Sequence, residues 1–361
     1  MTPRVCANMI VKNESRIIER CCFALSKVID CYVICDTGST DDTVDRIRAV
    51  FGSSGIPGEV VHAEFRNFEQ ARNEALDAAR SSRLDFDYIL MCDADMELTE
   101  VSPSWRDELT EPGHAILQRT PGGLEYRNIR LVRRDQPARY RGFTHEYLDI
   151  PGAASPIVHG LLYLDHQEGS NRIEKFERDI RLLREALDVY PDDARSAFYL
   201  ANSYFDIGRH VEAQHWYRKR LTLQGYGQEE YFSRYRIALG YQQLGSEPRF
   251  FHEMLLTHND YPHRAEPLHA LALHAQRANR HQLALSLARI GLLVPQPEDA
   301  LFVETDVYTW RLADIAAVAL YWLSKPDEAL TINEQLLALV PEDQRARIEA
   351  NAGFCRVALG A

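Results

Sequence analysis

The sequence contains no apolar run that approaches the roughly 20 residues needed to cross a bilayer. The longest candidate, residues 315–323, is about half that length. It continues a helical pattern that includes Arg311 and Asp314, which predicts a buried helix. The N-terminus also lacks a basic segment followed by an apolar one, the usual form of a signal peptide. We therefore expect no membrane span and a cytoplasmic location.

Paired cysteines and an excess of basic residues are missing as well. The seven cysteines are odd in number, form no Cys-x-x-Cys pair and lie mostly in apolar runs, which favours buried thiols over disulfides or zinc. The net charge of −12 argues against a nucleic-acid partner. A protein this acidic would benefit from a metal ion if it had to hold a diphosphate.

Two halves of the chain differ in their pattern. Up to about residue 170, strand-like runs alternate with helix-like segments, which predicts an α/β domain with a mostly parallel sheet covered on both faces. The expected strands are residues 5–11, 32–35, 59–65, 88–92 and 157–164, and the expected helices are residues 15–25, capped by Ser15, 40–50 and 68–79. We expect one domain over 1–170 and a second over 171–361.

The second half is rich in helix formers and repeats itself. Small and aromatic residues precede Gly208 and recur before Gly245, which is 37 residues further on, close to the period of tetratricopeptide repeats. Weaker copies centre on residues 272–284 and 316–329. An all-α array of such repeats is the expectation, and a helical bundle without repeats is the alternative.

Two acidic motifs follow strand-like runs in the first half. Asp93 and Asp95 come directly after an apolar strand, where open α/β sheets bind ligands and where two carboxylates can hold a divalent cation. Asp36 ends another strand and precedes Gly38 in a turn that leads into a helix, so it is a candidate to bind a ribose or base. A βα turn without a ligand is the alternative for Asp36.

These motifs, with two others in the same order, resemble family 2 glycosyltransferases of the Rossmann-like GT-A fold. The four motifs span residues 8–14, 35–43, 68–76 and 93–95, and the resemblance covers about residues 4–170. Fusion to tetratricopeptide repeats resembles a bacterial and phage subgroup that includes transferases acting on peptides.

The resemblance implies roles for individual residues. The donor nucleotide would be bound by residues of the first three motifs and by the first aspartate of the Asp-x-Asp pair, namely Asn13, Glu14, Asp36, Arg72, Asn73 and Asp93. For Asn73 the alternative is that it stabilises a helix packed on the sheet. The metal would be held by Asp93, Asp95 and His166, with Asp95 as the more direct ligand. A structural role is the alternative for His166.

The catalytic base is the least defined position. The family commonly supplies it from a Glu-Asp pair, which this sequence lacks, so the nearest candidate is Glu146, with His145 second. A salt bridge to Arg139 or Arg141 is the alternative for Glu146. Residues 127–134 alternate basic and apolar side chains on an expected strand that either reaches the acceptor or diphosphate or presents a solvated face. Residues 121–123 predict a turn.

The resemblance implies an inverting transfer from a UDP-sugar with Mn²⁺ or Mg²⁺ as cofactor. Because repeat arrays form extended concave surfaces, the acceptor is expected to be a peptide or protein, and the repeats are also a candidate site for a homodimer. The alternatives are a cell-surface glycan or a phage DNA base as acceptor, or an inactive domain that serves as a binding scaffold.

Overall fold

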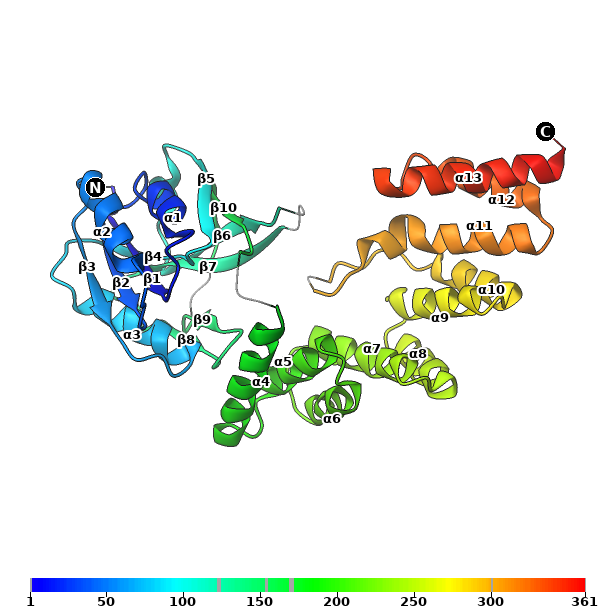
Figure 1. Ribbon diagram of the computed structural model, residues 1–361, viewed down its shortest axis with the longest axis horizontal. Coiled ribbons are helices and arrows are strands. Elements are labelled where there is room, and N and C mark those ends of the chain that lie inside the picture. Colours follow the sequence, from blue (N-terminus) through cyan, green and yellow to red (C-terminus); the bar gives the residue numbers. More distant parts are fainter. Residues whose placement is uncertain (1, 122–124, 153–154, 169–171, 300, 361) are drawn as a thin grey trace. The chain divides into compact units, whose positions relative to one another are not determined.

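The computed structural model describes residues 2–121, 125–152, 155–168, 172–299 and 301–360, which form two compact units (Figure 1). The first unit comprises Met1–Val189 and the second Tyr190–Ala361. The sequence placed the boundary after residue 170. The structure instead groups the helix α4 (Arg172–Val189) with the first unit.

An eight-stranded sheet organises the first unit. Its strands lie in the order β3-β2-β1-β4-β7-β6-β10-β5, and the first four are parallel. These four are β1 (Val5–Val11), β2 (Cys31–Asp36), β3 (Gly58–His62) and β4 (Tyr88–Met91). The other four are β5 (Met96–Val101), β6 (Gly113–Arg119), β7 (Glu125–Arg133) and β10 (Ile157–Asp165).

The second half of the sheet is mixed, which the expectation of a mostly parallel sheet did not capture. β7 pairs antiparallel with both β4 and β6, and β10 pairs parallel with β6 but antiparallel with β5. The expected turn at residues 121–123 lies between β6 and β7, and its two glycines are outside the described residues. A separate hairpin joins β8 (Arg139–Arg141) to β9 (Tyr147–Asp149).

Helices cover both faces of the parallel half, as the alternating pattern predicted. On one face α1 (Ile18–Leu25) and α2 (Thr43–Ser53) pack on the side chains at every second position of β1. On the other face α3 (Phe68–Ser81) packs through Leu76 and Ala79 on Cys6, Val33 and Ile89. A short 3-10 helix, η1 (Trp105–Glu108), buries Trp105 in the first of these cores.

The start of α1 differs from the expected position. The helix begins at Ile18, and Ser15 does not cap it. Instead the backbone N–H of Ser15 donates to Oδ2 of Asp41, whose other oxygen accepts from the backbone and hydroxyl of Thr43 at the start of α2. Asp41 therefore joins the two turns that precede α1 and α2.

The second unit is built from helical hairpins. The helices are α5 (Ala194–Asp206), α6 (His210–Leu221), α7 (Gly227–Gln243), α8 (Glu247–Asp260), α9 (Glu266–Arg277), α10 (His281–Gly291), a π-helical turn η2 (Val307–Arg311), α11 (Leu312–Trp322), α12 (Pro326–Leu336) and α13 (Glu342–Leu359). Buried alanines such as Ala201, Ala213 and Ala284 allow the helices to approach closely. Tetratricopeptide-like hairpins were the prediction.

The turns within four hairpins share one backbone conformation. Gly208 and Gly245 have φ values of 80° and 72°, and the equivalent turns of the two weaker copies place Asn279 and Ser324 at 57° and 58°. The turn thus has the left-handed conformation even in the two copies that have no glycine at this position. The weaker copies are helical hairpins that have Asn279 and Ser324 where the first two copies have glycine.

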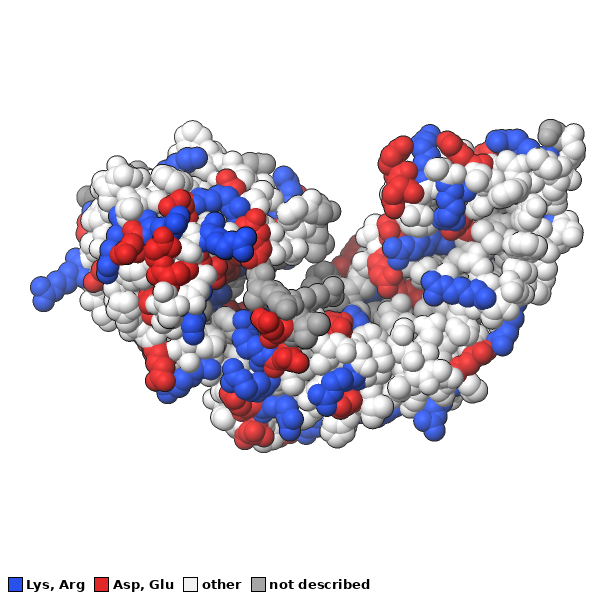
Figure 2. Space-filling model, in the orientation of Figure 1, with Lys and Arg blue, Asp and Glu red and all other residues white. Residues whose placement is uncertain are grey.

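Residues 315–323 lie mainly in α11, whose Ile315, Ala316 and Leu320 are buried, so the helix belongs to the core as expected. No helix in the described part of the chain is long and apolar enough to cross a membrane. All seven cysteines are buried free thiols. Figure 2 shows basic and acidic side chains intermixed on the visible face of the first unit, so the net negative charge is not gathered into one patch there.

Candidate functional site

The acidic motifs meet at one edge of the sheet because their strands are parallel neighbours. Asp36 is the last residue of β2, and Asp93 and Asp95 follow the end of β4, with only β1 between the two strands. Carboxyl ends of parallel strands share an edge, which is where such sheets bind ligands. The sequence prediction of a common site for these residues agrees with this topology.

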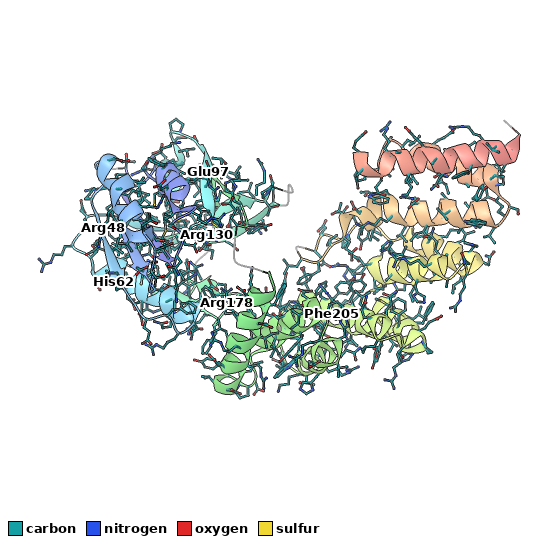
Figure 3. All side chains as sticks on the ribbon, in the orientation of Figure 1. Arg48, His62, Glu97, Arg130, Arg178 and Phe205 are labelled. Atoms are coloured by element: carbon teal, nitrogen blue, oxygen red, sulfur yellow. The ribbon has the colours of Figure 1, made fainter. Side chains whose placement is uncertain are left out.

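Two arginines hold Asp93 from opposite sides. Nη2 of Arg72, on α3, lies 2.6 Å from Oδ1 of Asp93, and Nη2 of Arg130, on β7, lies 2.9 Å from Oδ2. Figure 3 labels Arg130 within the sheet. Burial by itself raises the pKa of the Asp93 carboxyl, but the charges of Arg72 and Arg130 outweigh it and hold this pKa well below its usual range. Both oxygens of Asp93 are therefore occupied by guanidinium groups.

Asp95 is in the opposite situation. No cationic side chain of the described residues forms an ion pair with it, and the burial of its carboxyl together with the charges of Asp93 and Asp165 raises its pKa. Burial and the charges of Asp95, Asp41 and Asp93 raise the pKa of Glu14 in the same way. This edge of the sheet thus carries negative charge that the protein leaves uncompensated, which suits a divalent cation.

The expected ligand set of Asp93, Asp95 and His166 is not assembled in the structure. Nε2 of His166 lies 2.9 Å from Oε2 of Glu97, while its backbone N–H donates to the carbonyl of Asp95 at 3.2 Å. In the described ranges no group of three or more histidine, cysteine or acidic side chains has the arrangement of a metal site. Of the two aspartates in the predicted set, Asp93 is paired with two arginines and Asp95 has no ion-pair partner among the described residues.

Asp36 is almost fully buried and is already hydrogen-bonded. Its carboxylate accepts from the backbone N–H of Ser39 at 3.1 Å and lies 3.1 Å from Nδ1 of His62, the exposed last residue of β3. Asn13, with a left-handed φ of 56°, accepts from the backbone of Thr40 through its side-chain oxygen. Asn13 and Asp36 thus shape the turn that follows β2, next to the expected position of a nucleotide.

Asn73 has a structural environment. Its amide nitrogen donates to the carbonyl of Tyr140 at 3.0 Å, and its amide oxygen accepts from the N–H of the same residue at 2.9 Å. Both polar ends of the side chain are used to attach β8 to α3. The geometry agrees with the structural alternative for Asn73.

The candidate base is linked to the same arginine as Asp93. Oε1 of Glu146 accepts from Nε of Arg72 at 2.5 Å, and the side chain is 13 % exposed. The alternative partners are engaged elsewhere, because Arg139 pairs with Asp77 and Arg141 lies near Asp149. The expected salt bridge of Glu146 to Arg139 or Arg141 is therefore not formed, and Glu146 pairs instead with Arg72, 74 residues away in the chain.

Sequence reasoning missed two contributions to this site. Arg130 was noted only as part of a basic strand, whereas the structure buries it beside Leu131 and Val132, where an arginine needs an acidic partner. Tyr126, on the same strand, donates to Oδ2 of Asp165 at 2.5 Å, and burial with this hydrogen bond raises the pKa of its phenol. No local pattern connects Tyr126 with Asp165.

Comparisons with known proteins show what the chain is similar to. Residues 6–162 match the family model Glycosyl transferase family 2. A TPR repeat-containing protein of Synechococcus elongatus is 26% identical over 238 residues, covering 59% of this chain and 55% of that protein. The SPbeta prophage-derived glycosyltransferase SunS of Bacillus subtilis is 23% identical over 239 residues, covering 61% of this chain and 54% of that protein. The chain thus spans about half the length of these curated relatives.

A solved structure of MamA aligns with 48% of this chain and 86% of its own, at 15% identity and a TM-score of 0.37. The family match covers the strands that carry Asp36, Asp93 and Asp95, together with the hairpin that carries Glu146. Residues 6–162 of this chain therefore match the family model Glycosyl transferase family 2, and a second unit of helical hairpins follows them in the sequence.

Proposed function

We propose that the first unit binds a UDP-sugar at the acidic edge of its sheet and transfers the sugar to an acceptor with inversion. The observation that carries this proposal is the contrast between two aspartates one residue apart. Asp93 is neutralised by Arg72 and Arg130, whereas Asp95 has no cationic partner among the described residues and is crowded by other carboxylates. Such a pair is suited to a cation and the diphosphate it accompanies.

Asp95 is the protein ligand we assign to Mn²⁺ or Mg²⁺, with Asp93 holding the arginines beside it. When bound, such an ion offsets the negative charge that develops on the departing diphosphate. Asp36 and Asn13 shape the turn that faces the nucleotide, and Glu14 adds a carboxylate to the same edge. His166 supports this edge through Glu97 and its bond to the Asp95 carbonyl, rather than as a ligand in the conformation seen.

Glu146 is the proposed base. Arg72 holds its Oε1, and among the described residues no donor reaches Oε2, which leaves that oxygen to accept a proton from the acceptor. Because Arg72 also holds Asp93, the base and the donor-binding aspartate have a fixed separation. Fixed positions of this kind contribute to rate by aligning the reacting groups. His145 is the second candidate.

We propose a peptide or protein acceptor, bound with the help of the helical hairpins. Arrays of this kind present extended surfaces to which a flexible chain can bind along several repeats. A repeat-mediated homodimer is the second proposed use of the same unit. A cell-surface glycan as acceptor remains the alternative substrate class, because the donor site by itself does not distinguish acceptors.

Calorimetry of UDP binding, with and without Mn²⁺, tests the donor site. The wild-type chain is expected to bind UDP with Mn²⁺ and at least about tenfold more weakly without it, and Asp95→Asn should remove this dependence. Asp85→Asn is the control, because Asp85 is exposed and pairs with Arg4 on the surface. Equal affinity with and without metal, or normal metal dependence in Asp95→Asn, contradicts the assignment.

Slow release of UDP from a UDP-sugar in the absence of acceptor separates an enzyme from a scaffold. A transferase hydrolyses its donor at a low rate, and UDP-glucose and UDP-N-acetylglucosamine are the first probes. UDP binding without hydrolysis or transfer of any donor would favour the inactive-scaffold alternative.

A further inference from the structure

A buried carboxylate outside the family match contacts the loop that carries the candidate base. Asp179 lies on α4, beyond residue 162, and is 1 % exposed. Its Oδ1 accepts from the hydroxyl of Thr144 at 3.2 Å, and its Oδ2 lies 3.9 Å from Nε2 of His145. Arg178 provides the neighbouring positive charge at 3.3 Å. The carboxylate is thus directed at the two residues that immediately precede Glu146.

The loop itself has an unusual backbone. It joins β8 to β9, and both Gly142 and His145 have positive φ values, 103° and 53°. For histidine this conformation costs about 1–2 kcal/mol and persists only where the surroundings impose it. The left-handed residue directly before Glu146 therefore requires contacts that hold it, and Asp179 supplies them at Thr144 and His145.

Two helices hold the loop from different directions. From α3, Glu69 accepts from the backbone N–H of Gly142 at 2.6 Å, the backbone N–H of Phe68 donates to the carbonyl of Phe143 at 2.9 Å, and Arg72 holds Glu146. From α4, Asp179 holds Thr144 and lies beside His145, while the guanidinium of Arg178 stacks 5.0 Å from the ring of Phe68. Arg178 is labelled on α4 in Figure 3.

A purely structural role for Asp179 predicts a different environment. A buried aspartate that only stabilises a helix would satisfy its oxygens within that helix or with backbone N–H groups near it. Besides Arg178 of its own helix, the Asp179 carboxylate reaches a side chain 35 residues earlier in the chain, in the loop that carries the proposed base. Burying a charge in that position is costly, which is consistent with a function that depends on it.

We propose that Asp179 is a positioning residue for the sugar transfer. It fixes the conformation of the loop 142–146 so that Glu146 stays in reach of the acceptor. Through this contact α4 contributes to the activity. This inference rests on the proposed function. It also gives a reason why the first compact unit extends to Val189, well beyond the end of the family match.

The test compares Asp179→Asn and Asp179→Ala with Asp188→Asn, an exposed aspartate on the same helix. The first readout is hydrogen exchange of the backbone amides of residues 142–149. We expect at least about tenfold faster exchange in Asp179→Ala, a smaller increase in Asp179→Asn, and no change in Asp188→Asn. Unchanged exchange in Asp179→Ala overturns the proposal, because the contact would then not hold the loop.

The second readout separates turnover from donor binding. The rate of donor hydrolysis should fall by about 10–100-fold in both Asp179 variants, since a small displacement of a catalytic group has effects of this size. The dissociation constant for UDP with Mn²⁺ should stay within about twofold of the wild type, because Asp179 contacts neither Asp93 nor Asp95. Faster loop exchange with unchanged turnover would overturn the functional part of the inference.

A double-mutant cycle with Thr144→Ala tests whether Asp179 affects turnover through Thr144 or through His145. If Asp179 acts through Thr144, the two substitutions together should reduce turnover little more than Asp179→Asn does alone. Fully multiplicative effects would exclude that route and leave the one through His145. If the wild-type chain neither binds UDP nor hydrolyses a donor, the proposed function fails, whereas the exchange measurement still decides whether Asp179 holds the loop.

Discussion

Arg72 lies 2.6 Å from Asp93 through Nη2, and this pairing connects the proposed donor-binding motif with the candidate base through one arginine. The other edge of the guanidinium, Nε, reaches Oε1 of Glu146 at 2.5 Å. One planar cation thus sets the separation of the Asp93 and Glu146 carboxylates, and its side chain is only 13 % exposed. Lysine cannot reproduce this geometry, because its charge is a single point.

Arg72→Lys is therefore expected to reduce donor hydrolysis by about 100-fold, the size of effect seen when one preorganised donor is removed from an active site. The substitution keeps the charge but gives up one of the two contacts. Turnover with a UDP-sugar is the measurement. The exposed Arg66, just before α3, provides the matched control as Arg66→Lys. Near-normal turnover in Arg72→Lys would show that the shared cation is not needed.

Substitution of the two base candidates should distinguish them. Glu146→Gln keeps the size of the side chain and removes the proton acceptor, so turnover should fall by about 10²–10⁴-fold while UDP still binds. His145→Gln should have a clearly smaller effect, because the histidine contributes through its contact with Asp179. Rates of transfer or hydrolysis, with UDP calorimetry beside them, make the comparison. The reverse order of effects would identify His145 as the base.

Asn73→Ala should affect stability and spare the donor site. It leaves the N–H and carbonyl of Tyr140 without their partners, which costs about 1–3 kcal/mol for each buried group left unpaired. Thermal unfolding of the first unit, followed by the fluorescence of buried Trp105, measures the loss. Glu74→Ala, at an exposed position of the same helix, should be nearly neutral. Weaker UDP binding in folded Asn73→Ala would restore the donor role implied by the resemblance.

The second unit should lose stability below neutral pH through His269. Burial, followed by the charge of Arg311, lowers the pKa of His269 from 6.5 to about 4. Protons then bind the unfolded chain preferentially, so the free energy of unfolding falls as the pH drops from about 6.5 toward 4. Between pH 7 and pH 5 we expect a loss of about 2 kcal/mol.

Denaturant unfolding monitored by the tryptophans of the second unit, Trp216, Trp310 and Trp322, measures this effect. His269→Gln is the comparison, because it removes the titrating group from a position that is only 7 % exposed. The variant should be less sensitive to pH over the same interval. An equal pH dependence in both proteins would assign the loss to other groups.

Local patterns predicted the parts of the fold in which neighbours in sequence decide the outcome. The apolar runs of β1, β2 and β4 and the amphipathic α3 were predicted within a few residues. The position of Asp93 and Asp95 after β4 followed from the same pattern. The antiparallel insertion of β7 next to β4 could not be predicted, because antiparallel and parallel strands with buried faces look alike in sequence.

The partners of the site residues were beyond the reach of sequence reasoning. Asp93 meets Arg130 across 37 residues, and Glu146 meets Arg72 across 74. His166 lies beside Glu97 because β10 pairs with β5, and the spacing of residues in the sequence does not indicate this strand pairing. Ion pairs of this kind depend on tertiary structure, so the resemblance named candidate residues for the site but could not say how they are paired.

The left-handed residues in the hairpin turns imply an uneven distribution of strain along the array. Gly208 and Gly245 adopt positive φ without a steric penalty, whereas Asn279 and Ser324 hold it at a cost. In a chain of units that interact only with their neighbours, local opening begins where the intrinsic stability is least. The turns that resist opening most therefore lie near the start of the array, closest in sequence to the first unit, and the turns that open most easily lie toward the C-terminus.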